Sequence, residues 1–165
     1  MRHLTFFIAL SFLLVVIAAV LFSQVPVIQA PKTTSAVIAL VDGEAIARGD
    51  DCSTAVAYVS REVPEGLDLS ELAARLVSLS LLGSNTSEME RGLQTQFSFE
   101  VRVLEASVAN GVATVLLSKE ANDLAGSCAV GAARAQIEST LKTLPGVEAV
   151  VIRIEGVSAG EELQP

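Results

Sequence analysis

Residues Asn110–Gly156 read NGVATVLLSKEANDLAGSCAVGAARAQIESTLKTLPGVEAVVIRIEG, and this stretch decides the fold. The dipeptide Asn110-Gly111 is the strongest signal for a tight hairpin turn in the chain, because both residues tolerate positive φ. Val112–Ser118 follows it as the partner strand. After a polar loop, Cys128–Thr143 has the spacing of a helix, and Val147–Glu155 alternates apolar and polar residues like a strand. The stretch therefore predicts a strand, a loop, a helix and a strand.

The helix expected over Cys128–Thr143 has signals at both ends. The hydroxyl of Ser127 is a candidate N-cap, and Pro145 disfavours helical conformation in the residue before it. Glu138 and Lys142 stand four residues apart, which predicts an ion pair on the outer face. The apolar residues that share the predicted buried stripe are Val130, Ala133, Ile137, Leu141 and Leu144.

Residues Asp68–Leu82 predict an earlier helix. Asp68 and Glu71 have the spacing of a capping box. The apolar stripe expected to face the core comprises Leu69, Leu72, Ala73, Leu76, Leu79 and Leu82. Ser87-Glu88-Met89-Glu90 repeats the capping spacing and indicates one more helical turn. Asn85-Thr86-Ser87 matches a glycosylation sequon, but a turn and a cap account for it better.

Three further stretches predict strands. Ala36–Arg48 is rich in β-formers, and Asp42-Gly43 within it is either a hairpin turn or a break in one strand. Ala55–Val63 alternates as a strand does. Phe97–Ala109 is longer, and its apolar residues change face midway, which indicates a bulge near Val103-Leu104. The order β-β-α-β-β-α-β favours an α+β domain with a mainly antiparallel sheet and two helices packed on it.

The first thirty residues predict export of the rest of the chain. Met1-Arg2-His3 is a short basic start, and Leu4–Phe22 continues it as nineteen residues without a charge. As a helix this segment roughly matches a hydrocarbon core of about 30 Å. Its length favours an uncleaved, single-pass transmembrane helix over a cleaved signal peptide, whose apolar segment is shorter. Arg2 at the short end favours a domain outside the cytoplasm.

This interpretation divides the chain into four parts. Residues 1–30 are a signal anchor or signal peptide with the start of a tether, and residues 31–35 are the rest of the tether. Residues 36–157 form the folded domain, and residues 158–165 are an acidic tail. The expected location is the cell membrane, with the N-terminal helix in contact with lipid. A cleaved leader, the alternative, leaves the domain secreted.

The part beyond residue 30 is acidic. Ten Lys and Arg stand there against nineteen Asp and Glu, which gives a net charge of −9. Binding to nucleic acid needs clustered cations on one face, so this charge excludes a nucleic-acid partner. With no Trp and one Tyr in the chain, the core must consist mainly of aliphatic side chains.

Two cysteines, Cys52 and Cys128, both lie beyond the leader. An even pair in an exported domain is typical of a disulfide, although two buried thiols remain an alternative. Cys128 stands at a predicted helix start, where a thiolate would be stabilised. A nucleophilic role for it lacks a histidine base, because the only histidine is His3 in the leader.

No other pattern indicates catalysis, so we predict no enzyme activity and no catalytic, cofactor-binding or metal-binding residues. Nucleotide-binding glycine loops, nucleophile elbows and calcium-loop spacings are missing from the sequence. An acidic cluster is better explained as a solvated loop than as a calcium site; its members are Asp42, Glu44, Asp50 and Asp51. Arg61-Glu62 and Glu90-Arg91-Gly92 are interpreted as surface pairing and turn residues. The polar loops Gly49–Thr54 and Lys119–Gly126 are the expected place for a functional surface.

The region from Ala36 to the C-terminus resembles the GerMN domain family, named for a protein of sporulation and spore germination. The resemblance rests on the order and spacing of several blocks. These blocks are Val59–Pro64, Leu81-Leu82-Gly83, Glu90–Leu93, Asn110–Val115, Gly126-Ser127-Cys128, Ile137–Val147 and Leu163-Gln164-Pro165. Family members with a cysteine in the first loop and Gly-Ser-Cys before the second helix are most similar, which supports a Cys52–Cys128 bond.

The resemblance implies an extracytoplasmic, usually membrane-anchored α+β module without known catalytic activity or cofactors. We therefore expect a protein-interaction or envelope-assembly module whose partner is another envelope protein. The alternative is a binding module for a small molecule or a cell-wall fragment, which requires a concave pocket with converging polar groups.

Overall fold

The computed structural model describes residues 31–158 and residue 163. The expected membrane segment Leu4–Phe22 lies outside the described residues, as does most of the acidic tail. Within the described ranges, no helix combines the length and the apolar character that a membrane crossing requires. The compact unit that carries the fold begins at Lys32.

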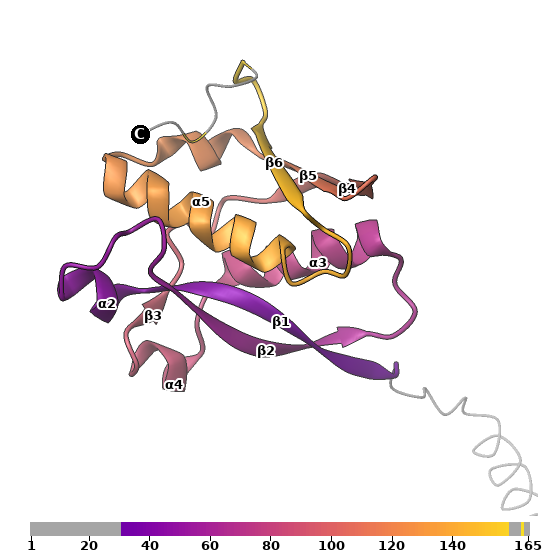
Figure 1. Ribbon diagram of the computed structural model, residues 1–165, viewed down its shortest axis with the longest axis horizontal. Helices are drawn as coiled ribbons and strands as arrows, with labels where there is room; N and C mark the ends of the chain where they lie inside the picture. The colour runs from indigo at the N-terminus through magenta and orange to yellow at the C-terminus, as the bar shows by residue number, and fades with distance from the viewer. Residues whose placement is uncertain (1–30, 159–162, 164–165) are drawn as a thin grey trace, which may run out of the picture. The chain divides into compact units, whose positions relative to one another are not determined.

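The elements of this unit follow one another as strands with intervening helices (Figure 1). In chain order they are β1 (Thr33–Asp42), α2 (Gly43–Ala47), β2 (Val56–Pro64), α3 (Leu69–Leu82), α4 (Thr86–Met89), β3 (Leu93–Gln94), β4 (Val103–Ala109), β5 (Val112–Leu117), the 3-10 helix η1 (Lys119–Asp123), α5 (Ser127–Leu141) and β6 (Ala149–Ile154).

The strands form two three-stranded sheets, not the single sheet expected from the sequence. One sheet has the order β2-β1-β3 and is antiparallel throughout; the other has the order β4-β5-β6. β4 and β5 pair antiparallel, whereas β5 and β6 pair parallel, because the chain crosses over through α5 before it returns. The α+β class is confirmed, and three of the four strand pairs are antiparallel.

Helices α3 and α5 pack against each other between the two sheets, and both contact both sheets (Figure 1). One continuous apolar core results. It contains Ile38 and Leu40 from the first sheet, Val115 and Ile152 from the second, and Leu76 from α3, with these side chains no more than 8% exposed. The domain is therefore held together through its helices.

Side chains of the two helices, and not a third long strand, cover the inner edge of β1. The Ala39 N–H donates to Thr140 Oγ1 at 3.0 Å, and Ser80 Oγ donates to the Ala39 carbonyl at 2.9 Å. Thr143 Oγ1 donates to the Val37 carbonyl at 3.1 Å. An uncovered strand edge invites pairing with another chain, so these hydroxyls satisfy the edge and attach β1 to α3 and α5.

Three local expectations are wrong or shortened in the first half of the chain. Asp42-Gly43 is not a hairpin turn; the alternative of a break is correct, because β1 ends at Asp42, whose Oδ1 accepts from the Ala45 N–H at 2.9 Å and caps α2. β1 already begins at Thr33, inside the expected tether. The strand expected over Phe97–Ala109 starts at Val103, although the bulge is confirmed by a register shift between Val103 and Glu105.

The predicted start of α3 is confirmed and its buried stripe is partly wrong. Asp68 and Glu71 form both halves of the capping box. Leu82, however, is 78% exposed and Leu69 is 40% exposed. The buried arc instead follows Ala73, Leu76, Val77, Ser80 and Leu81. The arc is rotated because α3 packs simultaneously on β1, β4 and α5.

For helix α5 the predicted buried stripe is confirmed and the predicted start is wrong. All five residues of its predicted stripe are buried, and Lys142 Nζ lies 3.6 Å from Glu138 Oε2 as expected. The predicted cap is wrong, because Gly126 occupies the N-cap position and no side chain caps the helix. Asn85 caps α4 through a bond from the Glu88 N–H at 3.0 Å, which confirms the turn-and-cap interpretation of the sequon.

Candidate functional site: an apolar groove beside helix α3

An apolar groove lies between the C-terminal half of α3 and the irregular segment that joins β3 to β4. It encloses about 510 Å³, a volume in the range of binding pockets. We call it the α3 groove and define it by Ser78, Leu81, Leu82, Thr95, Phe97, Phe99, Val101, Arg102 and Val103. The inner wall, on α3, and the outer wall, on the joining segment, both carry large apolar side chains.

The outer wall of the α3 groove is a tight turn with an exposed aromatic residue. The Val101 N–H donates to the Ser98 carbonyl at 3.2 Å and closes the turn, which places Phe99 at its tip. Phe97 and Val101 are 5% and 6% exposed and attach the turn to the core, whereas Phe99 is 94% exposed. Surface exposure of one apolar side chain is ordinary; an exposed ring beside an apolar groove and the exposed Leu82 is a candidate contact surface.

A buried amide positions the floor of the groove. Gln136 on α5 is fully buried. Its Nε2 donates to the Ser80 carbonyl at 2.9 Å and to Thr95 Oγ1 at 3.0 Å, while its Oε1 accepts from the Gln96 N–H at 3.2 Å. One side chain of α5 therefore fixes the inner wall, on α3, relative to the start of the outer wall at Thr95.

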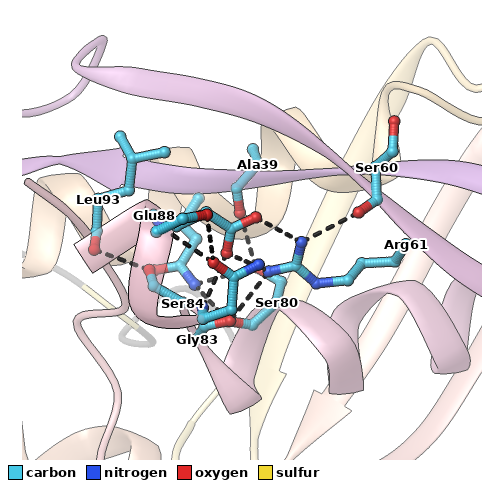
Figure 2. A network of polar contacts seen from close by, with 11 residues as sticks. Ala39, Ser60, Arg61, Ser80, Gly83, Ser84, Glu88 and Leu93 are labelled. Carbon is cyan, nitrogen blue, oxygen red and sulfur yellow. Dashed lines mark hydrogen bonds and ion pairs between the residues drawn. The ribbon is translucent and has the colours of Figure 1, made fainter. Parts of the chain in front are cut away.

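Beside the C-terminal end of α3, an ion pair connects strand β2 to helix α4 (Figure 2). Arg61 on β2 donates from Nη1 and Nη2 to the two carboxylate oxygens of Glu88, at 2.7 and 2.6 Å. Its Nη2 also donates to the Gly83 carbonyl at 3.2 Å. The side chains of Arg61 and Glu88 are only 17% and 6% exposed. Sequence reasoning placed Arg61 in surface pairing beside Glu62; the structure corrects this, because Arg61 reaches inward to α4.

Arg61 also sets the charge state of Glu88. Its hydrogen bonds to the carboxylate hold the pKa of Glu88 below the usual value, and burial alone acts in the opposite direction. The same carboxylate accepts from the Asn85 N–H at 2.9 Å and completes the α4 cap. Glu88 is therefore ionised at neutral pH and connects β2, the end of α3 and the start of α4.

The two cysteines are joined in the structure. Cys52 and Cys128 form a disulfide with a Cα–Cα distance of 5.3 Å and a sequence separation of 76 residues. The bond ties the loop before β2 to the first turn of α5, so neither sulfur is a free thiol. The interpretation of the pair as a structural link is confirmed, and the buried-thiol alternative is wrong.

The polar loops expected to carry a functional surface have structural roles in the fold. In Gly49–Thr54, the Asp51 carboxylate accepts from the Ser53 hydroxyl and N–H at 2.7 and 2.8 Å, and these bonds lower the pKa of Asp51. Part of Lys119–Gly126 is the 3-10 helix η1. The acidic cluster is not gathered on one point: Asp42 caps α2, and among the described residues no group of three or more candidate ligands could hold a metal ion.

The fold and the groove define a class: a small α+β domain with an apolar groove and no recognisable catalytic constellation among its described residues. A sequence profile of the Germane family, described as sporulation and spore germination, matches residues 40–160. The chain belongs to this family. No curated protein matches the sequence.

Two solved structures from Bacillus subtilis have a similar fold. The tandem GerMN domains of the sporulation protein GerM align with a TM-score of 0.55 and 17% sequence identity, over 82% of this chain and 43% of that one. The first GerMN domain of the same protein aligns with a TM-score of 0.52 and 15% identity, over 79% of this chain and 89% of that one. This chain thus spans less than half of the tandem structure and most of the single domain.

Proposed function

We propose that this chain is an extracytoplasmic, membrane-anchored interaction module that binds another protein of the cell envelope through the α3 groove. One observation carries the proposal: Phe99 and Leu82, 94% and 78% exposed, flank an apolar groove of about 510 Å³. Aromatic side chains beside desolvated pockets are the usual centres of protein interfaces. The anchor is the apolar segment Leu4–Phe22 of the sequence.

The chemistry of the groove favours a protein partner over a small molecule or a cell-wall fragment. Recognition of a polar ligand needs hydrogen-bonding groups that are free to converge on it. Here Ser78 Oγ already donates to the Ala74 carbonyl at 2.7 Å, and Thr95 Oγ1 already accepts from Gln136. Arg102 is the one charged lining residue. The proposal assigns no catalytic role to any residue.

The proposal is tested with the tagged full chain, cross-linked in intact cells and purified from solubilised membranes. Wild type is compared with Leu82→Ser/Phe99→Ser and with Tyr58→Ser, an exposed aromatic control on β2. We expect one or more envelope proteins to be recovered with wild type and with the control and to be lost with the groove variant. Recovery that does not differ between the two variants contradicts the proposal.

A further inference from the structure

The contact surface around the α3 groove contains both a projection and a cavity. Phe99 projects from the turn at 94% exposure, and the groove opens beside it. A two-fold symmetric interface uses the same surface on both chains. That surface must therefore be complementary to itself, with a cavity for every projection. A ring that projects next to an apolar groove satisfies this requirement, because each copy can offer its ring to the other's groove.

The charges on the turn are also self-complementary. Glu100 and Arg102 flank the buried Val101, and both are exposed. In the part of the chain that the structure describes, neither side chain lies within 4.0 Å of an opposite charge. One anion and one cation two residues apart are the minimum that a two-fold arrangement needs to form two reciprocal ion pairs.

This local balance matters because the domain as a whole repels itself. The part beyond residue 30 carries a net charge of −9, so a second copy can approach closely only where the facing charges compensate. At physiological salt the repulsion between more distant charges is screened beyond about 8 Å. Glu120 is near Arg102 on the same copy: the Ser118 hydroxyl is the main cause that lowers the pKa of Glu120, and the charge of Arg102 contributes less.

We infer that the partner of the α3 groove is a second copy of this chain, docked about a two-fold axis with each Phe99 in the other copy's groove. The inference rests on the proposed function, since it names an occupant for the same surface. It adds two specific contacts, Glu100 to Arg102 in both directions.

Charge reversal tests these contacts. Two full-length chains with different tags are expressed together, cross-linked in the membrane and purified through one tag. Glu100→Arg alone places two cations at the contact on each copy, and Arg102→Glu alone places two anions there. We expect each variant to lose association with itself by roughly tenfold or more, since two attractive contacts become repulsive. Both positions are exposed, so the melting temperature should not change.

The decisive sample contains one chain of each variant. The copy with two cations then meets the copy with two anions, so association should return to at least the wild-type level. Glu120→Gln serves as the control and should leave self-association unchanged. The inference is overturned if wild type does not self-associate, or if the mixed pair associates no better than either variant alone.

The outcome also separates this inference from the proposed function. If the mixed pair fails but Leu82→Ser/Phe99→Ser still loses a different envelope protein, the groove binds that protein and the self-docking arrangement is wrong. If the groove variant loses neither a second copy nor any other protein, both ideas fail.

Discussion

Replacement of Arg61 by methionine should destabilise the domain in a way that depends on pH. Methionine keeps much of the side-chain length and removes the charge, so the carboxylate of Glu88, only 6% exposed, loses both bonds from the guanidinium. Removal of one partner from a buried pair costs about 3–5 kcal/mol. Because 17% of the Arg61 side chain is exposed, we expect the lower end, about 3 kcal/mol, and a melting temperature lower by about 10 °C.

The pH dependence follows from the direction of the pKa shift. In wild type the pKa of Glu88 is depressed below its ordinary value of 4.5. Its contribution to stability is therefore fully present above that value and is lost as the pH falls through the lower pKa of the folded state. In the variant the largest cause of the lowered pKa is lost, and burial is opposed only by the Asn85 N–H and the charge of Arg91, so the pKa of Glu88 rises relative to wild type. The difference in unfolding free energy between wild type and variant should thus shrink from pH 7 to pH 3.

Urea denaturation of residues 31–165 at several pH values measures this difference. Arg134→Met is the matched control, because Arg134 pairs with Glu138 on the surface, with side chains 46% and 28% exposed. Its loss should cost less than about 0.5 kcal/mol. Adding Glu88→Gln to Arg61→Met should recover part of the loss. A cost for Arg61→Met no larger than the control, or one that does not vary with pH, would refute the reasoning.

Three further predictions concern the disulfide, the groove floor and the turn. Replacing Cys52 and Cys128 together by alanine should lower the unfolding free energy by about 4 kcal/mol or less in the chain-entropy model. Thiol labelling of the unreduced domain should modify neither cysteine, and labelling of both would contradict the disulfide. Gln136→Leu removes the partner of the Ser80 carbonyl and the Gln96 N–H and should cost about 2–4 kcal/mol by urea denaturation, against almost nothing for the exposed Gln94→Leu. Phe99→Ser should leave stability within about 0.5 kcal/mol of wild type, whereas Phe97→Ala two residues away should cost about 3–5 kcal/mol; equal costs would show that the turn is not arranged as described.

Several local signals in the sequence predicted the local structure correctly, although the hairpin at Asp42-Gly43 and the cap at Ser127 were wrong. The Asp68 and Glu71 spacing gave the start of α3, and Asn110-Gly111, with φ values of 51° and 77°, forms the turn between β4 and β5. These features depend on bonds between residues three or fewer positions apart, so they can be read from a short window. The cysteine pair was predictable for a different reason, because only one pairing is possible.

Features that depend on distant parts of the chain were not predictable in this way. The separation into two sheets depends on how α3 and α5 pack between them. Phe99 alternates with Phe97 and Val101 as in a strand, and nothing in the local sequence shows that a turn exposes it. Arg61 and Glu88 are 27 positions apart in the sequence. Both residues stand in motifs that the sequence shows, but their contact depends on the fold and could not be predicted from either motif. The α3 groove lies between two segments that are separate in the sequence, α3 and the chain from Thr95 to Val103, so it was not predicted.

The central claim is that the α3 groove is the contact surface of this domain. Site-specific photo-cross-linking in living cells tests it most directly, with a benzophenone amino acid placed at Leu82, at Phe99 or at the control position Tyr58 in the full chain. We expect positions 82 and 99 to capture the same protein, and position 58 not to capture it. Equal capture from all three positions, or capture from position 58 alone, would contradict it.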